Sequence, residues 1–94
     1  MIKAELVAEV SKTANVKAGV ALRVIECTMG VIKNEIINGN NVYLRGFGTF
    51  QSKERAQKIG RNISKNTPVV IPAHRIPAFK AGRDFKIATQ KASM

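Results

Sequence analysis

The sequence predicts an α+β fold with a helical hairpin, a short antiparallel sheet that carries a projecting β-ribbon, and a short C-terminal helix. The first observation is that apolar residues recur at three- and four-residue spacing over residues 3–37, which is typical of amphipathic helices. The second is that two strand-like segments flank the glycine-containing stretch RGFGTF at 45–50. The third is a basic segment without aromatic residues at 53–75, with turn-forming residues gathered near its middle.

The first forty residues are predicted to form two helices. Residues 3–14 make the first, and Asn15 breaks the pattern, so we expect it to cap a second helix that begins near Lys17. The second helix runs to about Ile37, where the sequence NGNN at 38–41 signals a stop and a turn. The apolar face of the first helix consists of Leu6, Val7, Val10 and Ala14.

The second helix is apolar on two sides and therefore needs two partners. The first helix can cover one stripe. Burial in the centre of one domain could cover the other, but a chain of this size buries only about 60–65% of its unfolded surface, so we expect a second subunit there. The first stripe is Ala18, Ala21, Leu22, Ile25, Met29, Ile32 and Ile36, and the second is Val20, Val24, Cys27 and Val31.

The stretch RGFGTF is similar to the start of the RNP1 box of RNA-recognition motifs. That interpretation fails because the residues before Tyr43 are helical and contain no aromatic, and because Thr49 stands where the box has an aromatic. We instead expect Gly46 and Gly48 to form a tight turn between a strand at 42–45 and one that begins at Thr49. Close approach of this glycine backbone to a phosphate is a further possibility. We expect core positions for Phe47 and Phe50.

Residues 53–75 are predicted to form a β-hairpin arm. Turn formers at 64–67 place its tip, and each strand of about ten residues would span roughly 30 Å at about 3.3 Å per residue. A compact domain of this length has a radius of gyration of only about 13 Å, so the arm should project. The return strand carries three prolines, which suits an edge. A last helix over about 83–92 is expected to bury Phe85 and Ala88.

Alternation along the outgoing strand predicts a basic stripe on one face of the arm. With a tip near residue 65, Arg55 would face Arg75 across the ribbon, so that Arg75 joins the stripe. On the outgoing strand the same face carries Lys53, Arg55, Gln57, Ile59, Arg61, Ile63 and Lys65.

Charge is concentrated in the second half of the chain. Residues 1–44 hold five bases and four acids, a net charge of 5 − 4 = +1, whereas residues 45–94 hold eleven bases and two acids, a net charge of 11 − 2 = +9. This asymmetry points to a polyanion, and above all to nucleic acid, as the partner.

Catalysis is not indicated. The chain has one histidine, His74, on the predicted arm, one cysteine, Cys27, on an apolar stripe, and one aspartate, Asp84, so no nucleophile–base pair or metal-ligand spacing is suggested. We therefore expect no enzyme, no metal and no cofactor. A single cysteine, no signal-peptide pattern and no membrane-length apolar run fit a protein of the reducing cytoplasm.

Three motifs together give the chain a family resemblance. GFGTF at 46–50, GRN at 60–62 and IPAFKAG at 76–82 resemble the HU/integration host factor family of bacterial histone-like DNA-bending proteins, and the resemblance covers essentially the whole chain. It implies one domain over 1–94, with a helical dimerisation part at 1–41, a three-stranded antiparallel sheet with the protruding arm at 42–80, a C-terminal helix at 83–92, and an intertwined dimer.

The resemblance also implies a function. Two basic arms would bind the minor groove of double-stranded DNA and bend or wrap it, largely without sequence specificity, in the nucleoid. The subunits would form a homodimer, or a heterodimer with a paralogue. Sequence-nonspecific RNA binding, and site-specific bending of the integration host factor type, remain alternatives.

Site residues follow from the same resemblance. The family usually inserts a proline after GRN as a wedge between base pairs, and Ile63 stands there; we expect it to keep that role, the alternative being packing on Val69. Asn66 replaces the usual tip glycine and tolerates a left-handed turn. The expected DNA-binding residues are Lys3, Lys53, Arg55, Lys58, Arg61, Asn62, Ile63, Lys65, Arg75, Lys80, Arg83 and Lys86. The expected core or dimer contacts are Val20, Val24, Cys27, Val31, Phe47, Phe50 and Phe79.

Overall fold

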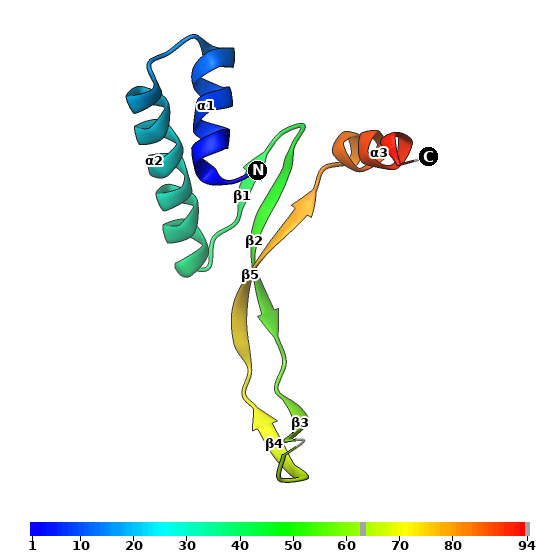
Figure 1. The fold of residues 1–94 in the computed structure, drawn as a ribbon. Coiled ribbons are helices and arrows are strands. Elements are labelled where there is room, and N and C mark those ends of the chain that lie inside the picture. Colours follow the sequence, from blue (N-terminus) through cyan, green and yellow to red (C-terminus); the bar gives the residue numbers. More distant parts are fainter. Residues whose placement is uncertain (63, 94) are drawn as a thin grey trace. The chain divides into compact units, whose positions relative to one another are not determined.

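The computed structural model describes residues 1–62 and 64–93. It divides into two compact units, Met1–Asn34 and Glu35–Met94. No helix in these described stretches is long and apolar enough to cross a membrane. The elements run in the order α1 (Lys3–Ala14), α2 (Ala18–Ile37), β1 (Val42–Leu44), β2 (Gly48–Arg55), β3 (Lys58–Asn62), β4 (Thr67–Ile71), β5 (His74–Ala81) and α3 (Arg83–Ala92), as Figure 1 shows.

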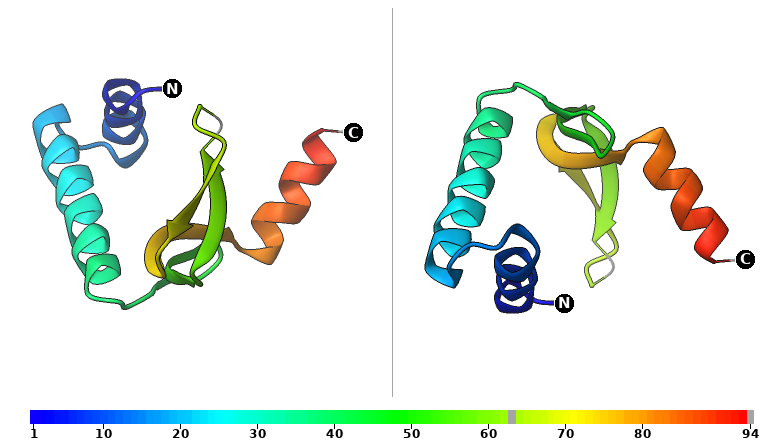
Figure 2. Two further views of the ribbon diagram at one scale, coloured as in Figure 1. Left: turned by 90° about the horizontal axis from the view of Figure 1, so that it is seen from below. Right: turned by 90° about the horizontal axis from the view of Figure 1, so that it is seen from above.

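Helices α1 and α2 form the predicted hairpin, and α1 lies beside the N-terminal half of α2 (Figure 2). The expectation that Asn15 starts the second helix was wrong. Asn15 instead ends α1 in the left-handed conformation, with φ of 55° and its backbone N–H donating to the Ser11 carbonyl. Asparagine serves here because it tolerates this conformation better than most residues. The Ser11 hydroxyl, in turn, donates to the Val16 carbonyl at 2.6 Å and closes the turn.

The two apolar stripes of α2 differ in exposure. Ala21 of the first stripe is buried, as is Val7 of α1, with 2% and 7% of their surfaces exposed, although Leu22 and Met29 of the same stripe are 37% and 47% exposed. In the second stripe, Val20 is 48% exposed and Val24 is 58% exposed. Cys27 and Val31 are also exposed. The stripe that the sequence assigns to a second subunit is therefore open in the single chain.

A three-stranded antiparallel sheet in the order β1-β2-β5 confirms the predicted fold class. The turn between β1 and β2 comprises residues 45–47, and Gly46 occupies it with φ of +82°. The expectation that Gly48 also belongs to the turn needs correction, because Gly48 is the buried first residue of β2. A Cβ at this position would lie 2.6 Å from both the Lys80 carbonyl oxygen and the Phe79 ring, so only glycine fits between β2 and β5.

Four phenylalanines cluster on one face of the sheet. Phe50 and Phe79 are paired across β2 and β5, with ring centroids 4.9 Å apart, and Phe47 lies 5.3 Å from Phe79. Phe85 of α3 lies 5.5 Å from Phe47. The expectation that α3 buries Phe85 and Ala88 was wrong for the single chain, because Phe85 is 40% exposed and no residue of α3 is buried. One side of this cluster is uncovered.

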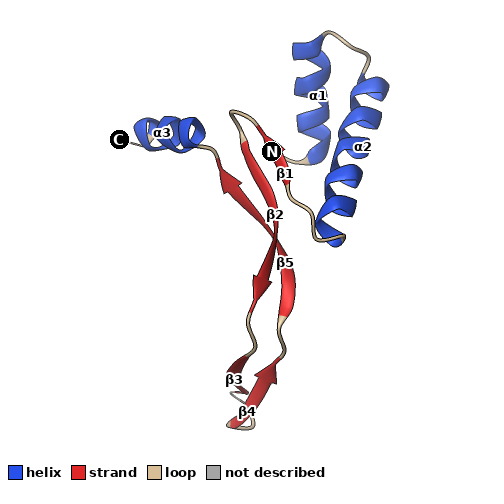
Figure 3. Cartoon of the chain, turned by 180° about the vertical axis from the view of Figure 1, so that it is seen from behind, coloured by secondary structure: helices blue, strands red, loops and turns tan. Residues whose placement is uncertain are grey.

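The arm is a hairpin with an interruption. Strands β2 and β5 continue past the end of β1 as a two-stranded ribbon as far as the pair Arg55–His74. After two residues on each strand, β3 and β4 form a second ladder from Lys58–Ile71 to Asn62–Thr67 (Figure 3). Equal gaps on both sides keep one register through the whole hairpin. Where the sequence predicts one continuous ribbon, the structure has two ladders in series.

The close approach at Gly48 predicts the effect of adding one methyl group. Gly48→Ala should lower the free energy of unfolding by about 1–3 kcal/mol, because a backbone carbonyl cannot move aside without distorting the ladder. Gly19→Ala is the matched control, since a Cβ at Gly19 in α2 meets nothing within 4 Å and should stabilise the helix by about 0.5–1 kcal/mol. Urea unfolding followed by circular dichroism at a fixed protein concentration measures both. Equal stability of the two variants would contradict the packing described for Gly48.

Candidate nucleic-acid interface

The sheet and the base of the arm have one polar face and one aromatic face. Paired residues in an antiparallel ladder share a face, and alternate residues along a strand do the same. The face that carries Phe50 and Phe79 is aromatic. The other face holds cations from both strands: on β2 it carries Thr49, Gln51, Lys53 and Arg55, and on β5 it carries Lys80, Ala78, Ile76 and His74.

The register corrects the predicted position of Arg75. Arg75 pairs with Glu54, and His74 pairs with Arg55, so Arg75 lies on the face opposite the basic stripe. The reason is at the tip, where the last pair is Asn62–Thr67 and the centre of the hairpin falls between residues 64 and 65. A tip centred on residue 65 itself would have brought Arg75 opposite Arg55.

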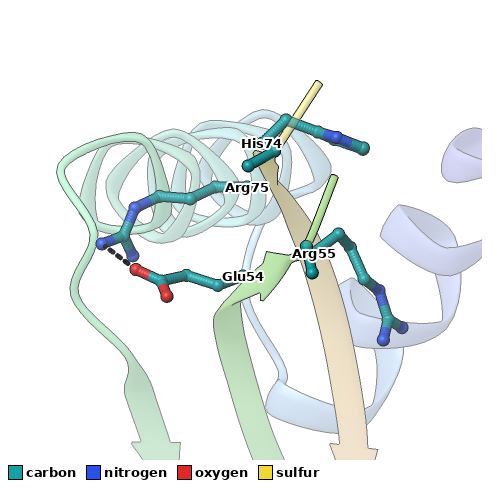
Figure 4. A pocket seen from close by; sticks show the side chains of 6 residues that line it. Glu54, Arg55, His74 and Arg75 are labelled. Carbon is teal, nitrogen blue, oxygen red and sulfur yellow. Dashed lines mark hydrogen bonds and ion pairs between the residues drawn. The ribbon is translucent and has the colours of Figure 1, made fainter. Parts of the chain in front are cut away.

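Arg75 is held by its neighbours at the base of the arm. Its Nη2 lies 3.0 Å from Glu54 Oε1 (Figure 4). Its Nη1 donates to the Ser52 hydroxyl at 3.4 Å. These contacts give Arg75 a structural partner that the sequence-based prediction did not anticipate. They also neutralise Glu54, the one acidic residue of the arm.

An open hollow of about 510 Å³ lies where the first ladder ends, and Figure 4 shows four of its lining residues. His74 Nδ1 is 2.8 Å from the Pro72 carbonyl oxygen. Because a carbonyl oxygen only accepts, Nδ1 carries the proton in this contact. No group of three or more potential metal-ligating residues occurs among residues 1–62 and 64–93. The lining residues are Glu54, Arg55, Ala56, Ala73, His74 and Arg75.

The outer ladder distributes its polar residues over both faces. Ile59 and Arg61 share one face, whereas Lys58 and Asn62 alternate onto the other. The predicted stripe of odd-numbered residues therefore includes Arg61 but not Lys58. Both cations are exposed to solvent.

The tip is organised by two asparagines. Asn62 Oδ1 accepts hydrogen bonds from the backbone N–H groups of Ser64 and Lys65, at 3.1 Å and 3.4 Å. Asn66 has φ of 53°, which confirms the expected left-handed turn, and its Oδ1 accepts from Arg61 Nη1 at 3.2 Å. Lys65 belongs to the turn rather than to a strand. The predicted wedge, Ile63, lies outside the described residues.

Cations outside the arm occupy three kinds of position. Lys80 is an exposed residue of β5 on the polar face of the sheet. Arg83 and Lys86 are exposed residues in the first turns of α3, three apart and so on neighbouring parts of one helix face. In the N-terminal unit, Lys3 Nζ lies 3.0 Å from Glu26 Oε1, with both side chains about half exposed. Such an exposed ion pair is weak and easily exchanged for another anion.

Sequence reasoning assigned no role to Tyr43. Its side chain is 75% exposed, and it pairs with Thr49, which places it on the polar face. Alternation along residues 42–45 could have placed Tyr43 on this face, but a segment of four residues is too short for alternation to be decisive.

The chain matches a known family over nearly its full length. The model for "Bacterial DNA-binding protein" matches residues 1–90. The DNA-binding protein HU of Nostoc sp. is 42% identical over 94 residues, covering 98% of this chain and 100% of the relative. HU-beta of Pseudomonas aeruginosa is 39% identical over 88 residues, covering 94% of this chain and 98% of the relative.

Solved structures agree with these sequence matches. A cocrystal structure of Anabaena HU with DNA superposes with a TM-score of 0.90 at 39% identity, covering 95% of this chain and 97% of that chain. An HU variant from Thermotoga maritima, at 22% identity and a TM-score of 0.72, shares the fold. On this evidence, the chain belongs to the family of bacterial DNA-binding proteins that includes HU.

Proposed function

We propose that the protein is an architectural DNA-binding protein of the HU type, which binds duplex DNA through basic β-arms in the minor groove and bends or wraps it. The observation that carries the proposal is the polar face of the hairpin, where Lys53 and Arg55 of the first ladder and Arg61 of the second extend from a thin two-stranded ribbon. A ribbon of this width fits a groove, and arginine and lysine suit the negative potential of a narrow minor groove.

Binding of this kind carries little sequence information. Cations that contact phosphates fix the position of the protein on DNA but do not read bases, and the minor groove distinguishes mainly A·T from G·C. We therefore propose binding largely without sequence specificity, with a role in organising the nucleoid. Lys80, Arg83 and Lys86 would contact the flanks of the bent segment. Unstacking one base step costs about a few kcal/mol, which the additional ionic contacts offset.

Bending requires two arms, and we propose that a second copy of the chain supplies the other. Two apolar surfaces support this proposal: the open stripe of α2 and the half-exposed phenylalanine cluster. Among the described residues, Val7 and Ala21 are the buried hydrophobic ones, which is too little burial for a stable independent fold. A homodimer would cover both surfaces and present two arms to one duplex.

A charge placed in the open stripe should prevent this association. Val24→Asp should raise the dimer dissociation constant by at least about tenfold, because a buried unpaired carboxylate costs several kcal/mol. Lys33→Asp introduces the same residue on the opposite, polar side of α2 and should leave the dimer intact. Sedimentation equilibrium over a range of concentrations measures both constants. A monomeric wild-type chain, or equal dissociation of the two variants, would contradict the proposed interface.

End-to-end energy transfer on a doubly labelled duplex of about 35 bp tests bending directly. Transfer should rise when the wild-type protein binds, and binding should weaken steeply with salt through counterion release. Ile63→Ala should retain binding but reduce the rise in transfer, because the proposed wedge is lost. Ile59→Ala is the matched control, since Ile59 is another exposed isoleucine of the arm, 73% exposed and away from the tip.

Two results would contradict the proposal, one from this experiment and one from the same titration with duplex RNA. Binding without any change in transfer would leave a basic protein that coats DNA without bending it. Tighter binding to duplex RNA than to duplex DNA would favour the alternative function, RNA binding. The proposed arms should show the opposite preference, because the grooves of A-form RNA do not admit a thin ribbon in the same way.

The face assignment of the two arginines predicts different salt dependences. Arg55→Gln should reduce the slope of log affinity against log salt concentration by about two, because the dimer loses one phosphate contact from each of its two arms. Arg75→Gln should leave that slope nearly unchanged, because Arg75 pairs with Glu54 of β2 and so lies on the face opposite the basic stripe. Fluorescence anisotropy titrations at four salt concentrations provide the slopes. Equal reductions for both variants would show that Arg75 leaves Glu54 to bind DNA.

A further inference from the structure

Tyr43 lies at one end of a transverse row of side chains on the polar face of the sheet. It pairs with Thr49 of β2, and Thr49 pairs with Lys80 of β5, so one side chain from each of the three strands lies in this row. Thr49 is half-buried, whereas Lys80 is exposed and Tyr43 is 75% exposed. An aromatic ring this exposed on an edge strand gains little from burial, and its ring and hydroxyl are accessible to a partner.

The hydroxyl of Tyr43 is oriented by Asn41. Asn41 directly precedes strand β1, which begins at Val42. Its Oδ1 accepts a hydrogen bond from the backbone N–H of Ser52 at 3.0 Å. This contact fixes the amide orientation, because a backbone N–H requires the oxygen as its acceptor. The Nδ2 group of Asn41 then donates to the Tyr43 hydroxyl at 3.4 Å.

A phenol oxygen that accepts from Asn41 keeps its own proton for another partner. That partner must accept hydrogen bonds, and Lys80 in the same row favours an anion. A phosphodiester meets both requirements, because its oxygens carry negative charge and only accept. Thr49 supplies a second hydroxyl between the two.

We infer that Tyr43 is a DNA-binding residue of this protein, whose hydroxyl donates to a backbone phosphate that Lys80 also contacts. This inference rests on the proposed function and adds a neutral, directional donor to a set of contacts that is otherwise cationic. A hydrogen bond from a fixed hydroxyl depends on the phosphate position, whereas the lysine contact depends mainly on charge.

The sequence offers a direct probe, because Tyr43 is the single tyrosine of the chain. Replacing it biosynthetically with 3-fluorotyrosine gives a fluorine resonance from this one position in an otherwise native protein. Titration with a duplex of about 35 bp should shift that resonance at saturation if the phenol contacts DNA. An unmoved resonance in a fully bound protein would overturn the inference.

Removal of the hydroxyl alone provides the energetic test. Tyr43→Phe should weaken binding by about three- to tenfold, which corresponds to the net contribution of an ordinary, partly exposed hydrogen bond. The salt slope should stay unchanged because no charge is lost, whereas Lys80→Gln should reduce it by about two, one for each subunit of the dimer. The double variant should be less than additive if both groups contact one phosphate. Thr13→Val, which removes an exposed hydroxyl from α1, is the control and should bind as the wild type does.

The outcomes separate this inference from the proposed function. If the wild-type chain binds and bends DNA while Tyr43→Phe binds equally well, the hydroxyl has no role and the inference alone fails. The same holds if only Tyr43→Ala is weaker, since the ring rather than its hydroxyl would then be used. If the wild-type chain does not bind DNA at low salt, the proposed function fails and this inference with it.

Discussion

The pairing register of the long hairpin is the constraint on which the rest of the molecule depends. One register runs from Gly48 opposite Ala81 to Asn62 opposite Thr67, through both ladders. It directs Lys53, Arg55 and Lys80 to one face of the sheet, and Phe50 and Phe79 to the other. A slip of one residue would set Arg55 against Arg75 and break the pairing of Phe50 with Phe79, so that charge repulsion and lost aromatic packing act together against it.

The single chain leaves its apolar surface open in two places, and this couples folding to assembly. The valines of the second stripe of α2 and the phenylalanines of the sheet are half exposed in the isolated chain. In a dimer, the free energy gained by covering them would be part of the folding free energy of each subunit. Stability measured for such a protein then depends on its concentration.

The sequence predicts the element order and fold class because these depend on local signals. Helical spacing over 3–37, the glycine turn at Gly46 and the turn formers of the tip each act within a few residues. The features that the sequence could not predict depend on distances between segments that are far apart in the chain. The place of Arg75 depends on where the tip is centred, and the need for glycine at Gly48 depends on the approach of Phe79 and Lys80. The role of Asn15 was missed because asparagine is suited to both ends of a helix.

The interruption between the two ladders separates the tip from the sheet. Residues 56–57 and 72–73 lie outside both ladders, and the outer hairpin has its own five-residue strands and its own asparagine turn. Substitutions near the tip therefore act on a module that can vary without disturbing the packing of the body. Asn66, which stands where the family resemblance implies a glycine, falls within this module. Changes at the tip can thus alter how the arm engages its partner while the strand pairing of the sheet stays as it is.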